Sequence, residues 1–349
     1  MLFQNKILES QKETRNIQNE LHLLSSHSKL RGVEFFTPNE YYGLDLIFKA
    51  FMSLQESQSL YFALPHGAET GSSRNLALYS GVEAVPVLIY NNEIGRMEIK
   101  RRRSPGWAIQ GEHGFLILLE LLSYFDRLPE FSTNAREILF FPPHVNNTSW
   151  KIADPNEDYR TCQELILNYN LTERVDISLP TSDLIAGRDR VFRNHGFRVV
   201  SCGSPNDSKF LNRFLNLVSD YSKIASKTLG SHIYFARAIG KEVEWLGPLD
   251  DTHSWHAKKI HESGELENTL EINRTTVEFI RTLDKPVSVE TARKLLGERG
   301  SIEKEKWLEL QKFGRSRDYL PFSPREAGMK IHLPRPIRRK IKSIRSGVH

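Results

Sequence analysis

Residues 221–246 read YSKIASKTLGSHIYFARAIGKEVEWL, and the pattern of this stretch determines the fold class. A short apolar, β-prone run at 223–226 precedes a turn at Gly230, and the apolar residues of 233–239 then recur at helical spacing. Another β-prone run follows at 242–246. We therefore predict a strand, a glycine-containing turn, a helix and a second strand, a unit suited to a ligand that carries phosphate groups.

The same alternation of short apolar runs and amphipathic segments extends upstream to residue 137. The pattern predicts strands over 137–141, 175–179 and 197–202, and helices over 159–169, 184–194 and 210–218. Strands that alternate with helices imply right-handed crossovers and a parallel sheet. We therefore predict a doubly wound, Rossmann-like lobe over residues 137–265.

The first half of the chain shows a weaker version of the same pattern. We predict strands over 33–37, 60–64 and 84–90, and helices over 44–54 and 115–125. These elements indicate an N-terminal α/β lobe over 32–130. We predict a helical segment before it, at 1–31. After the second lobe we predict a helical extension with a basic tail, at 266–349. The predicted fold class is α/β with two Rossmann-like doubly wound lobes and that C-terminal extension.

The composition indicates a globular protein whose basic character lies in its tail. Of the 349 residues, 39% are hydrophobic and 26% are charged, which is typical of folded domains. The net charge is +5, yet residues 330–349 alone hold seven Lys and Arg side chains and no acidic one. Because the rest of the chain is close to neutral, we expect no nucleic-acid partner.

The basic tail, residues 330–349, also bears on localisation. Isoleucines alternate with its cations, so the tail could lie on an anionic membrane surface, and a solvated terminus is the alternative. No run approaches the roughly 20 apolar residues that a membrane span requires. We predict a cytoplasmic protein that the tail could bring to the inner face of the membrane.

Cys162 and Cys202 are expected to be buried hydrophobic residues without a disulfide.

Candidate ligand-binding residues follow the predicted strands, because ligands of open α/β sheets bind outside the carboxyl ends of the strands. Small, hydroxylated or imidazole side chains are common there. They are His66 and Glu69 in the first half, and His144, Gly203, Ser204, Thr228, Gly230, Ser231 and His232 in the second. The turn at Gly230 is the sharpest candidate for an anion, although simple helix capping would explain it too. The sequence contains neither a dinucleotide fingerprint nor a P-loop, so we expect no cofactor.

A proton acceptor is expected in the first half of the chain. His66 directly follows an apolar run and precedes Gly67, where an imidazole could take a proton near neutral pH. Glu69 is the alternative base. A structural histidine in a turn is the other interpretation of His66.

A metal site is not expected. His253, His256 and His261 lie in a predicted loop with no cysteine nearby, and their spacing fits no closed zinc pattern. An Asp-x-Asp pair that could hold a divalent ion on a nucleotide diphosphate is absent as well. Helix amides and basic side chains would then have to stabilise a leaving diphosphate.

Several strings resemble the GT-B class of glycosyltransferases and the related sugar-nucleotide epimerases, in particular proteins of bacterial capsule and lipopolysaccharide assembly. They are PHG at 65–67, EILFFPPH at 137–144, NHGFRVV at 194–200, DSKFLNR at 207–213, TLGSHI at 228–233 and GK at 240–241. The resemblance implies a cleft with a nucleotide-sugar donor on the second lobe and a saccharide or lipid-linked acceptor on the first, which also supplies the base. Arg237 lies in the helix where GT-B enzymes commonly carry a ribose-binding Glu.

We therefore expect a metal-independent glycosyltransferase of bacterial surface polysaccharide synthesis. The diphosphate would lie at Gly230 to His232, and His66 or Glu69 would deprotonate an acceptor hydroxyl for direct displacement at the anomeric carbon. Two alternatives remain open. One is a sugar-nucleotide epimerase or hydrolase that uses the same cleft, and the other is a binding or scaffold protein that has kept the fold and lost catalysis.

Overall fold

The fold was analysed in a computed structural model. It describes residues 30–34, 36–64, 67, 87–90, 108–131, 133, 137–143, 156–169, 174–227, 230–246 and 288–298, together with residues 305, 307, 308, 311 and 312.

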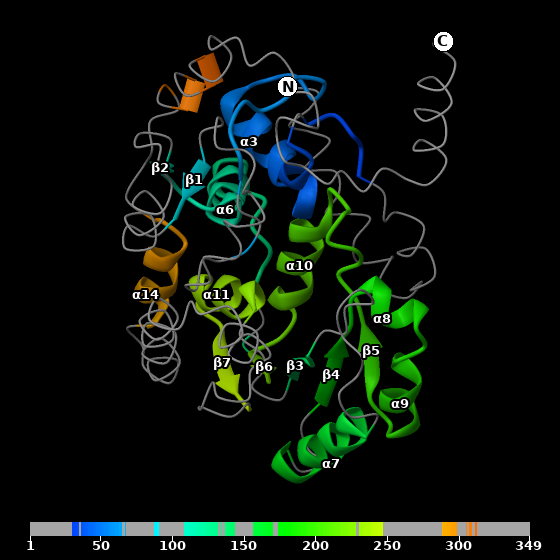
Figure 1. The fold of residues 1–349 in the computed structure, drawn as a ribbon. Coiled ribbons are helices and arrows are strands. Elements are labelled where there is room, and N and C mark those ends of the chain that lie inside the picture. Colours follow the sequence, from blue (N-terminus) through cyan, green and yellow to red (C-terminus); the bar gives the residue numbers. More distant parts are fainter. Residues whose placement is uncertain are drawn as a thin grey trace, which may run out of the picture.

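A five-stranded parallel sheet forms the centre of the second half (Figure 1). Its strands are β3 (Glu137–Phe141), β4 (Arg174–Ser178), β5 (Arg198–Val200), β6 (Lys223–Ser226) and β7 (Glu242–Trp245). They lie in the order β5-β4-β3-β6-β7. The chain thus moves outward from β3 to β5 and then returns to place β6 on the other side of β3. This is the strand order of Rossmann-like sheets, so the prediction of an α/β protein with a parallel sheet is confirmed.

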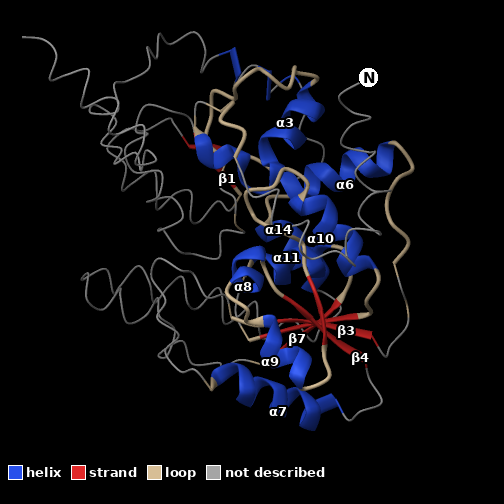
Figure 2. Cartoon of the chain, turned by 90° about the vertical axis from the view of Figure 1, so that its right-hand side faces the viewer, coloured by secondary structure: helices blue, strands red, loops and turns tan. Residues whose placement is uncertain are grey.

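Helices cover both faces of this sheet, as Figure 2 shows with the strands seen end-on. The alternation of side chains along β3 explains why. Leu139 and Phe141 point to a core that includes residues of α10 (Phe210–Ser219) and α11 (Ser231–Ala238). Ile138 and Phe140 point to the opposite core, which includes residues of α7 (Glu157–Tyr169). Strand β3 therefore contributes to two hydrophobic layers.

The helix predicted over 184–194 is wrong in one respect, because the chain forms two short helices there. They are α8 (Thr181–Ile185) and α9 (Asp189–Asn194). Gly187 lies between them with φ +75°, a left-handed conformation that ends a helix. The other predicted strands and helices of 137–246 are confirmed with small shifts of their ends.

The N-terminal elements pack onto the α10 and α11 side of the sheet. They are the 3-10 helix η1 (Thr37–Gly43), α3 (Leu44–Met52), the two-stranded parallel sheet of β1 (Val87–Ile89) and β2 (Ala108–Gln110), and α6 (Gly114–Tyr124). The ring of Phe115 in α6 stacks on Phe235 in α11, with centroids 4.5 Å apart. Residues of both halves therefore belong to one continuous hydrophobic core.

The strand predicted over 33–37 is wrong, and the reason is a side chain that binds the backbone. The carboxylate of Glu40 accepts hydrogen bonds from the backbone N–H groups of Gly32, Val33 and Glu34 at 2.6 to 3.0 Å. A neighbouring strand would otherwise have supplied those acceptors. Thr37 already belongs to η1, in which proline occupies the first turn.

The strand predicted over 60–64 is also wrong, for the same reason. The backbone N–H of Leu60 donates to Glu34 Oε2 at 2.9 Å, and that of Leu64 donates to Asn39 Oδ1 at 2.7 Å. Among the described residues, this segment forms a single bridge, in which Leu88 N donates to Ala63 O at 2.9 Å. The segment bends at Tyr61 and Phe62 and is held by side chains, and a pattern of apolar residues cannot reveal this.

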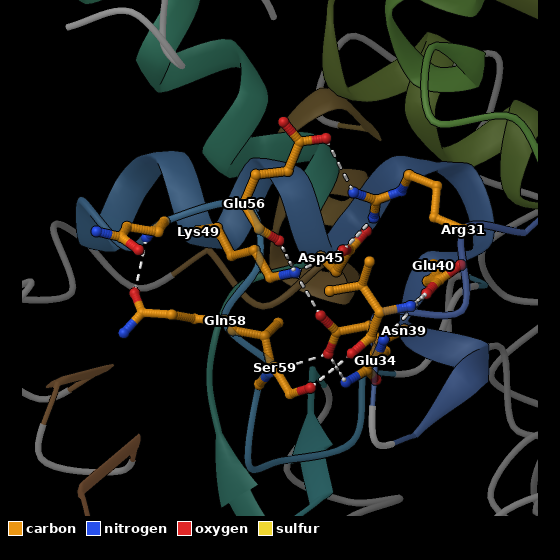
Figure 3. Close-up of polar contacts among 12 residues, drawn as sticks. Arg31, Glu34, Asn39, Glu40, Asp45, Lys49, Glu56, Gln58 and Ser59 are labelled. Atoms are coloured by element: carbon orange, nitrogen blue, oxygen red, sulfur yellow. Dashed lines mark hydrogen bonds and ion pairs between the residues drawn. The ribbon is translucent and has the colours of Figure 1, made fainter.

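A cluster of buried charges, which we call the Lys49 cluster, joins these segments to α3 (Figure 3). Lys49 Nζ lies 2.5 Å from Glu34 Oε1 and 3.0 Å from Asp45 Oδ2, and all three side chains have 0% exposure. Lys49 also donates to the carbonyl oxygen of Glu56 at 3.0 Å, and Arg31 pairs with Asp45. Burial raises the pKa of Glu34, although Lys49 opposes that shift.

The C-terminal part returns to both halves of the core. Helix α14 (Ser288–Leu295) packs on α11, and Arg293 Nη1 donates to the carbonyl oxygen of Ala238 at 3.2 Å. Further along, the ring of Trp307 lies 5.0 Å from that of Phe48 in α3. Gln311 accepts from Tyr61 N at 2.9 Å. In the part of the chain that the structure describes, no helix is long and apolar enough to cross a membrane.

Candidate functional site

The strand order places a candidate site between β3 and β6. The chain leaves these two neighbouring strands in opposite directions, toward β4 and toward β7. Ligands of open α/β sheets bind at such a switch point, outside the carboxyl ends of the strands. The last residues of the two strands, Phe141 and Ser226, are partners in the sheet register. The residues that follow them therefore line the position at which a ligand is expected.

Ser226 and His232 form a hydrogen-bonded pair at this position. Ser226 Oγ donates to the carbonyl oxygen of Phe141 at 3.0 Å, and His232 Nε2 lies 3.0 Å from Ser226 Oγ. A hydroxyl has a single hydrogen, so the one that Ser226 gives to Phe141 requires His232 Nε2 to carry its own hydrogen. The imidazole also stacks on the Phe141 ring, with centroids 4.5 Å apart. Both switch-point strands thus fix the orientation of His232.

Gly230 is the N-cap of α11, and its lack of a side chain is required by His232. Its φ of −123° suits any residue, but a Cβ atom at Gly230 would lie 2.5 Å from His232 Nδ1. Gly230 itself has no side chain that could cap α11, and the first turn of this helix contains no acidic residue. The first amides of the helix and its dipole therefore favour an anion at Gly230 and Ser231.

The first crossover helix, α7, differs in this respect. In many Rossmann-like proteins the helix after the first strand receives the phosphate groups. Here its first turn contains Glu157 and Asp158. Asp158 forms a bidentate pair with Arg188 at 2.6 and 2.7 Å, so this end of α7 already has its own charge partner. Of the two helices, α11 has the start that suits an anion.

Lys227 adds a cation on the opposite face of the sheet from His232. It directly follows β6, and its Nζ donates to Thr161 Oγ1 of α7 at 3.1 Å and pairs with Glu164. Sequence reasoning missed Ser226 and Lys227, although both directly precede the predicted turn. Their importance depends on β6 lying beside β3, and a single sequence does not show the strand order.

Gly203 and Ser204 were predicted to line the same site, but they follow β5 at the edge of the sheet. Two strands separate β5 from β6, which corresponds to about 14 Å between the strands. Gly203 has φ +88°, and a Cβ there would meet Arg213 Nη2 at 2.8 Å. Ser204 Oγ accepts from the backbone N–H of Asn206 at 3.2 Å. In the structure both residues shape the turn that leads to α10.

Arg213 explains why this turn needs glycine. Its side chain is buried, its Nε donates to the carbonyl oxygen of Cys202 at 2.9 Å, and its Nη2 pairs with Asp207 at 2.5 Å.

Cys162 and Cys202 are both buried free cysteines, as predicted. Burial raises the pKa of the Cys162 thiol to about 11 and that of Cys202 to about 12. Neither is suited to act as a thiolate near neutral pH.

The remaining candidates lie outside the described residues. They are the proposed bases His66 and Glu69, the proposed ligand contacts His144 and Thr228, and the histidines 253, 256 and 261. Among the residues that the structure describes, no group of three or more His, Cys, Asp or Glu side chains could hold a metal ion.

Comparison of the chain with protein-family models, with curated proteins and with solved structures found no match.

Proposed function

We propose that this protein is a metal-independent, GT-B-like glycosyltransferase that uses a nucleotide-sugar donor in bacterial surface polysaccharide synthesis. One observation supports this proposal above the others. At the switch point, the pair Ser226 and His232 lies beside the start of α11, which contains no acidic residue in its first turn. A helix start of this kind favours a phosphate group, and the switch point is where α/β proteins bind nucleotides.

In the proposed mechanism the diphosphate of the donor lies at Gly230 and Ser231. The backbone N–H groups of the first turn of α11 would donate hydrogen bonds to its phosphate oxygens, and Lys227 would exchange its pairing with Glu164 for a phosphate oxygen. An acceptor hydroxyl loses its proton to His66 or Glu69 and attacks the anomeric carbon. The bond from that carbon to the diphosphate oxygen breaks, and the site stabilises the charge of the leaving group.

The N-terminal elements would form the acceptor side. The acceptor would be a saccharide or a lipid-linked saccharide, and the basic tail, residues 330–349, would hold the protein at the inner face of the membrane. Co-sedimentation with anionic vesicles tests the tail. The full-length chain should sediment with them, and a variant with the seven tail cations replaced by Gln should stay in solution.

Donor binding is tested by thermal unfolding in the presence of UDP-glucose, GDP-mannose and CMP-sialic acid. At least one should stabilise the protein by the ligand-linkage relation, about 2.7 kcal/mol at one hundred times its Kd. Gly230→Ala should abolish that stabilisation, because the new Cβ would displace His232. Gly196→Ala is the matched control, since it costs stability through its φ of +85° but meets nothing within 4 Å. No shift with any of the three would contradict the proposal.

Sugar transfer and the base are tested in a second experiment. Each donor that binds is incubated with bacterial saccharide acceptors, and released nucleotide and product are both measured. His66→Ala or Glu69→Ala should retain donor binding and lose turnover. Epimerised donor without transfer would favour the epimerase, hydrolysed donor alone would favour the hydrolase, and binding without any turnover would favour a binding or scaffold protein.

A further inference from the structure

We propose that an exposed acidic and apolar surface at the end of α6 is a docking site for the basic tail, residues 330–349, of the same chain. We call this surface the α6 strip. It consists of three acidic and three large apolar side chains, namely Glu120, Asp126, Glu130, Tyr124, Leu128 and Phe131. The inference goes beyond the proposed function, because docking of the tail concerns neither the donor nor the acceptor.

The apolar side chains of the α6 strip are large and exposed. Tyr124 is 81% exposed, Leu128 40% and Phe131 39%. Phe131 is held in place, because Nζ of the buried Lys241 lies 5.2 Å from the centre of its ring and donates to the carbonyl oxygen of Ser219 at 3.0 Å. The strip therefore runs from the end of α6 to the second half of the fold. Exposed apolar side chains that gather in this way mark interaction sites.

The acidic side chains of the α6 strip determine the charge of the partner that fits it. Glu120, Asp126 and Glu130 are exposed, and none of them forms an ion pair or a side-chain hydrogen bond with another residue that the structure describes. Arg127 is the single cation between residues 120 and 131. Because complementary charge selects the partner and excludes others, the strip fits a basic segment that also carries apolar side chains.

Exposed apolar side chains also lie on α7, but the acidic residues beside them differ from those of the α6 strip. Leu167 on α7 is 77% exposed. Asp158 and Glu164 on the same helix already pair with Arg188 and Lys227. A basic segment would have to displace those cations on α7, whereas the carboxylates of the α6 strip have no such partner in the described part of the chain. The α6 strip is therefore the better docking surface for it.

The tail, residues 330–349, has the composition that complements the α6 strip. It contains seven Lys and Arg side chains and no acidic one. Five large apolar residues alternate with these cations, namely Ile331, Leu333, Ile337, Ile341 and Ile344. Apolar residues of the tail would cover Tyr124, Leu128 and Phe131, while its cations would pair with the three carboxylates. Neither kind of contact would leave an unpaired charge under an apolar side chain.

The chain is long enough for its own tail to reach the strip. Lys312 and the start of the tail are 18 residues apart, which spans about 60 Å when extended at about 3.3 Å for each residue. The radius of gyration expected for a compact chain of 349 residues is only about 20 Å. A flexible tether holds its end at an effective concentration on the order of mM, so the chain's own tail competes well with other basic segments.

Docking of the tail would have a consequence for membrane binding. The tail cations that pair with the α6 strip are the same ones that would face an anionic bilayer, so the strip and the bilayer compete for them. The strip would keep the tail of the free protein covered, and an anionic bilayer would release it. This consequence rests on the membrane role proposed above, whereas the docking itself does not.

Photo-crosslinking in the full-length chain tests the docking. p-Benzoylphenylalanine replaces Tyr124, and mass spectrometry identifies the residues to which the probe links. We expect crosslinks to residues 330–349 within one chain, with a yield that does not change on dilution. The matched control carries the same probe at Leu167, which is similarly exposed but lies on α7. That position should give no crosslink to the tail.

A triple variant of the strip tests the role of charge. It combines Glu120→Gln, Asp126→Asn and Glu130→Gln in the chain that carries the probe at position 124. Asn is the suitable replacement for Asp126, because this residue has φ +51° and Asn tolerates that conformation. The population with a docked tail should fall about fivefold, since each exposed ion pair is weak and three are lost. About 1 M salt should lower the yield of the unmutated strip in the same way. Circular dichroism checks that the variant is folded.

Each outcome decides one claim. The docking is overturned if position 124 gives no crosslink to residues 330–349, if the folded triple variant gives the same yield, or if the yield falls on dilution, which would indicate a second copy of the chain. Anionic vesicles should lower the yield in the protein that sediments with them, and an unchanged yield there would overturn the competition. Failure to sediment would overturn the membrane role of the tail and leave the docking intact.

Discussion

Replacing Lys49 by Met tests a fully buried cation. Lys49 Nζ contacts the carboxylates of Glu34 and Asp45 at 2.5 and 3.0 Å, and the exposure of all three side chains is 0%. The substitution removes the cation that Glu34 contacts, while Asp45 keeps its pair with Arg31. Met has a similar length and fills much of the space, so the main effect is electrostatic.

The expected loss follows from the cost of leaving a buried carboxylate unpaired. Removing one partner of a buried ion pair typically costs about 3 to 5 kcal/mol. Unfolding entropy is about 2.1 cal/mol/K for each residue, so a chain of 349 residues has about 0.7 kcal/mol/K. The unfolding midpoint of the Lys49→Met variant should therefore fall by about 4 to 7 °C at neutral pH.

Thermal unfolding followed by calorimetry and by tryptophan fluorescence measures this loss. Trp307 is a local reporter, because its ring lies 5.0 Å from Phe48, the residue before Lys49. The matched control is Lys294→Met, an exposed lysine on α14, which should stay within about 0.5 kcal/mol of wild type. A midpoint for Lys49→Met no lower than that of the control would refute the reasoning.

The pH dependence provides a second check on the same variant. Burial raises the pKa of Glu34 in the folded protein, and removing Lys49 takes away an interaction that lowers it. A carboxyl whose folded pKa is raised contributes stability below its unfolded pKa, and that contribution is lost as the pH rises through the folded pKa. The difference between wild type and variant should therefore shrink as the pH falls toward 4, and a difference independent of pH would contradict this account.

Two further predictions concern backbone conformation and acid stability. Gly43→Ala should destabilise the fold by more than about 2 kcal/mol in urea unfolding, because the φ of Gly43 is +73° and a Cβ there would lie 2.0 Å from the carbonyl oxygen of Ser208. An unchanged urea midpoint would show that the end of η1 does not pack on Ser208. Burial pushes the pKa of Asp176 up, but hydrogen bonds from Arg198 and Tyr221 outweigh it and hold the pKa below its usual value. Stability from Asp176 is therefore present above its unfolded pKa of about 3.9 and lost as the pH falls through the lower folded value. Asp176→Asn should be less stable at pH 6 and should lose less on acidification, which a urea series from pH 6 to pH 2 would measure.

The sequence predicted the second half of the fold well because its strands are short apolar runs between clear turns. The bounds of β3 and β6 match the predicted strands, and α11 ends at Ala238, one residue before the predicted helix end at 239. These strands and helices follow from the local spacing of apolar residues, which the sequence shows directly.

In the first half, the helices predicted over 44–54 and 115–125 are confirmed as α3 and α6, whereas the strands predicted over 33–37 and 60–64 are wrong because side chains bind their backbone. Glu40 and Asn39 take hydrogen bonds that β-ladders would otherwise supply, and they lie up to 25 residues from the backbone that they bind. The candidate site was predicted in part for a similar reason. The turn from Gly230 to His232 is visible locally, whereas the contact of Ser226 with Phe141 joins residues 85 positions apart and depends on the strand order.

The contact between Gln311 and Tyr61 spans 250 residues and has a consequence for synthesis on the ribosome. A ribosome adds about 5 to 20 residues per second, so Tyr61 waits about 12 to 50 s for this partner. During that interval the nascent chain exposes the apolar surface of Phe48 and Phe62 that Trp307 later covers. The N-terminal segment is thus a natural client for chaperones that bind before translation ends, and truncation ahead of Trp307 should yield a chain that aggregates rather than a smaller folded protein.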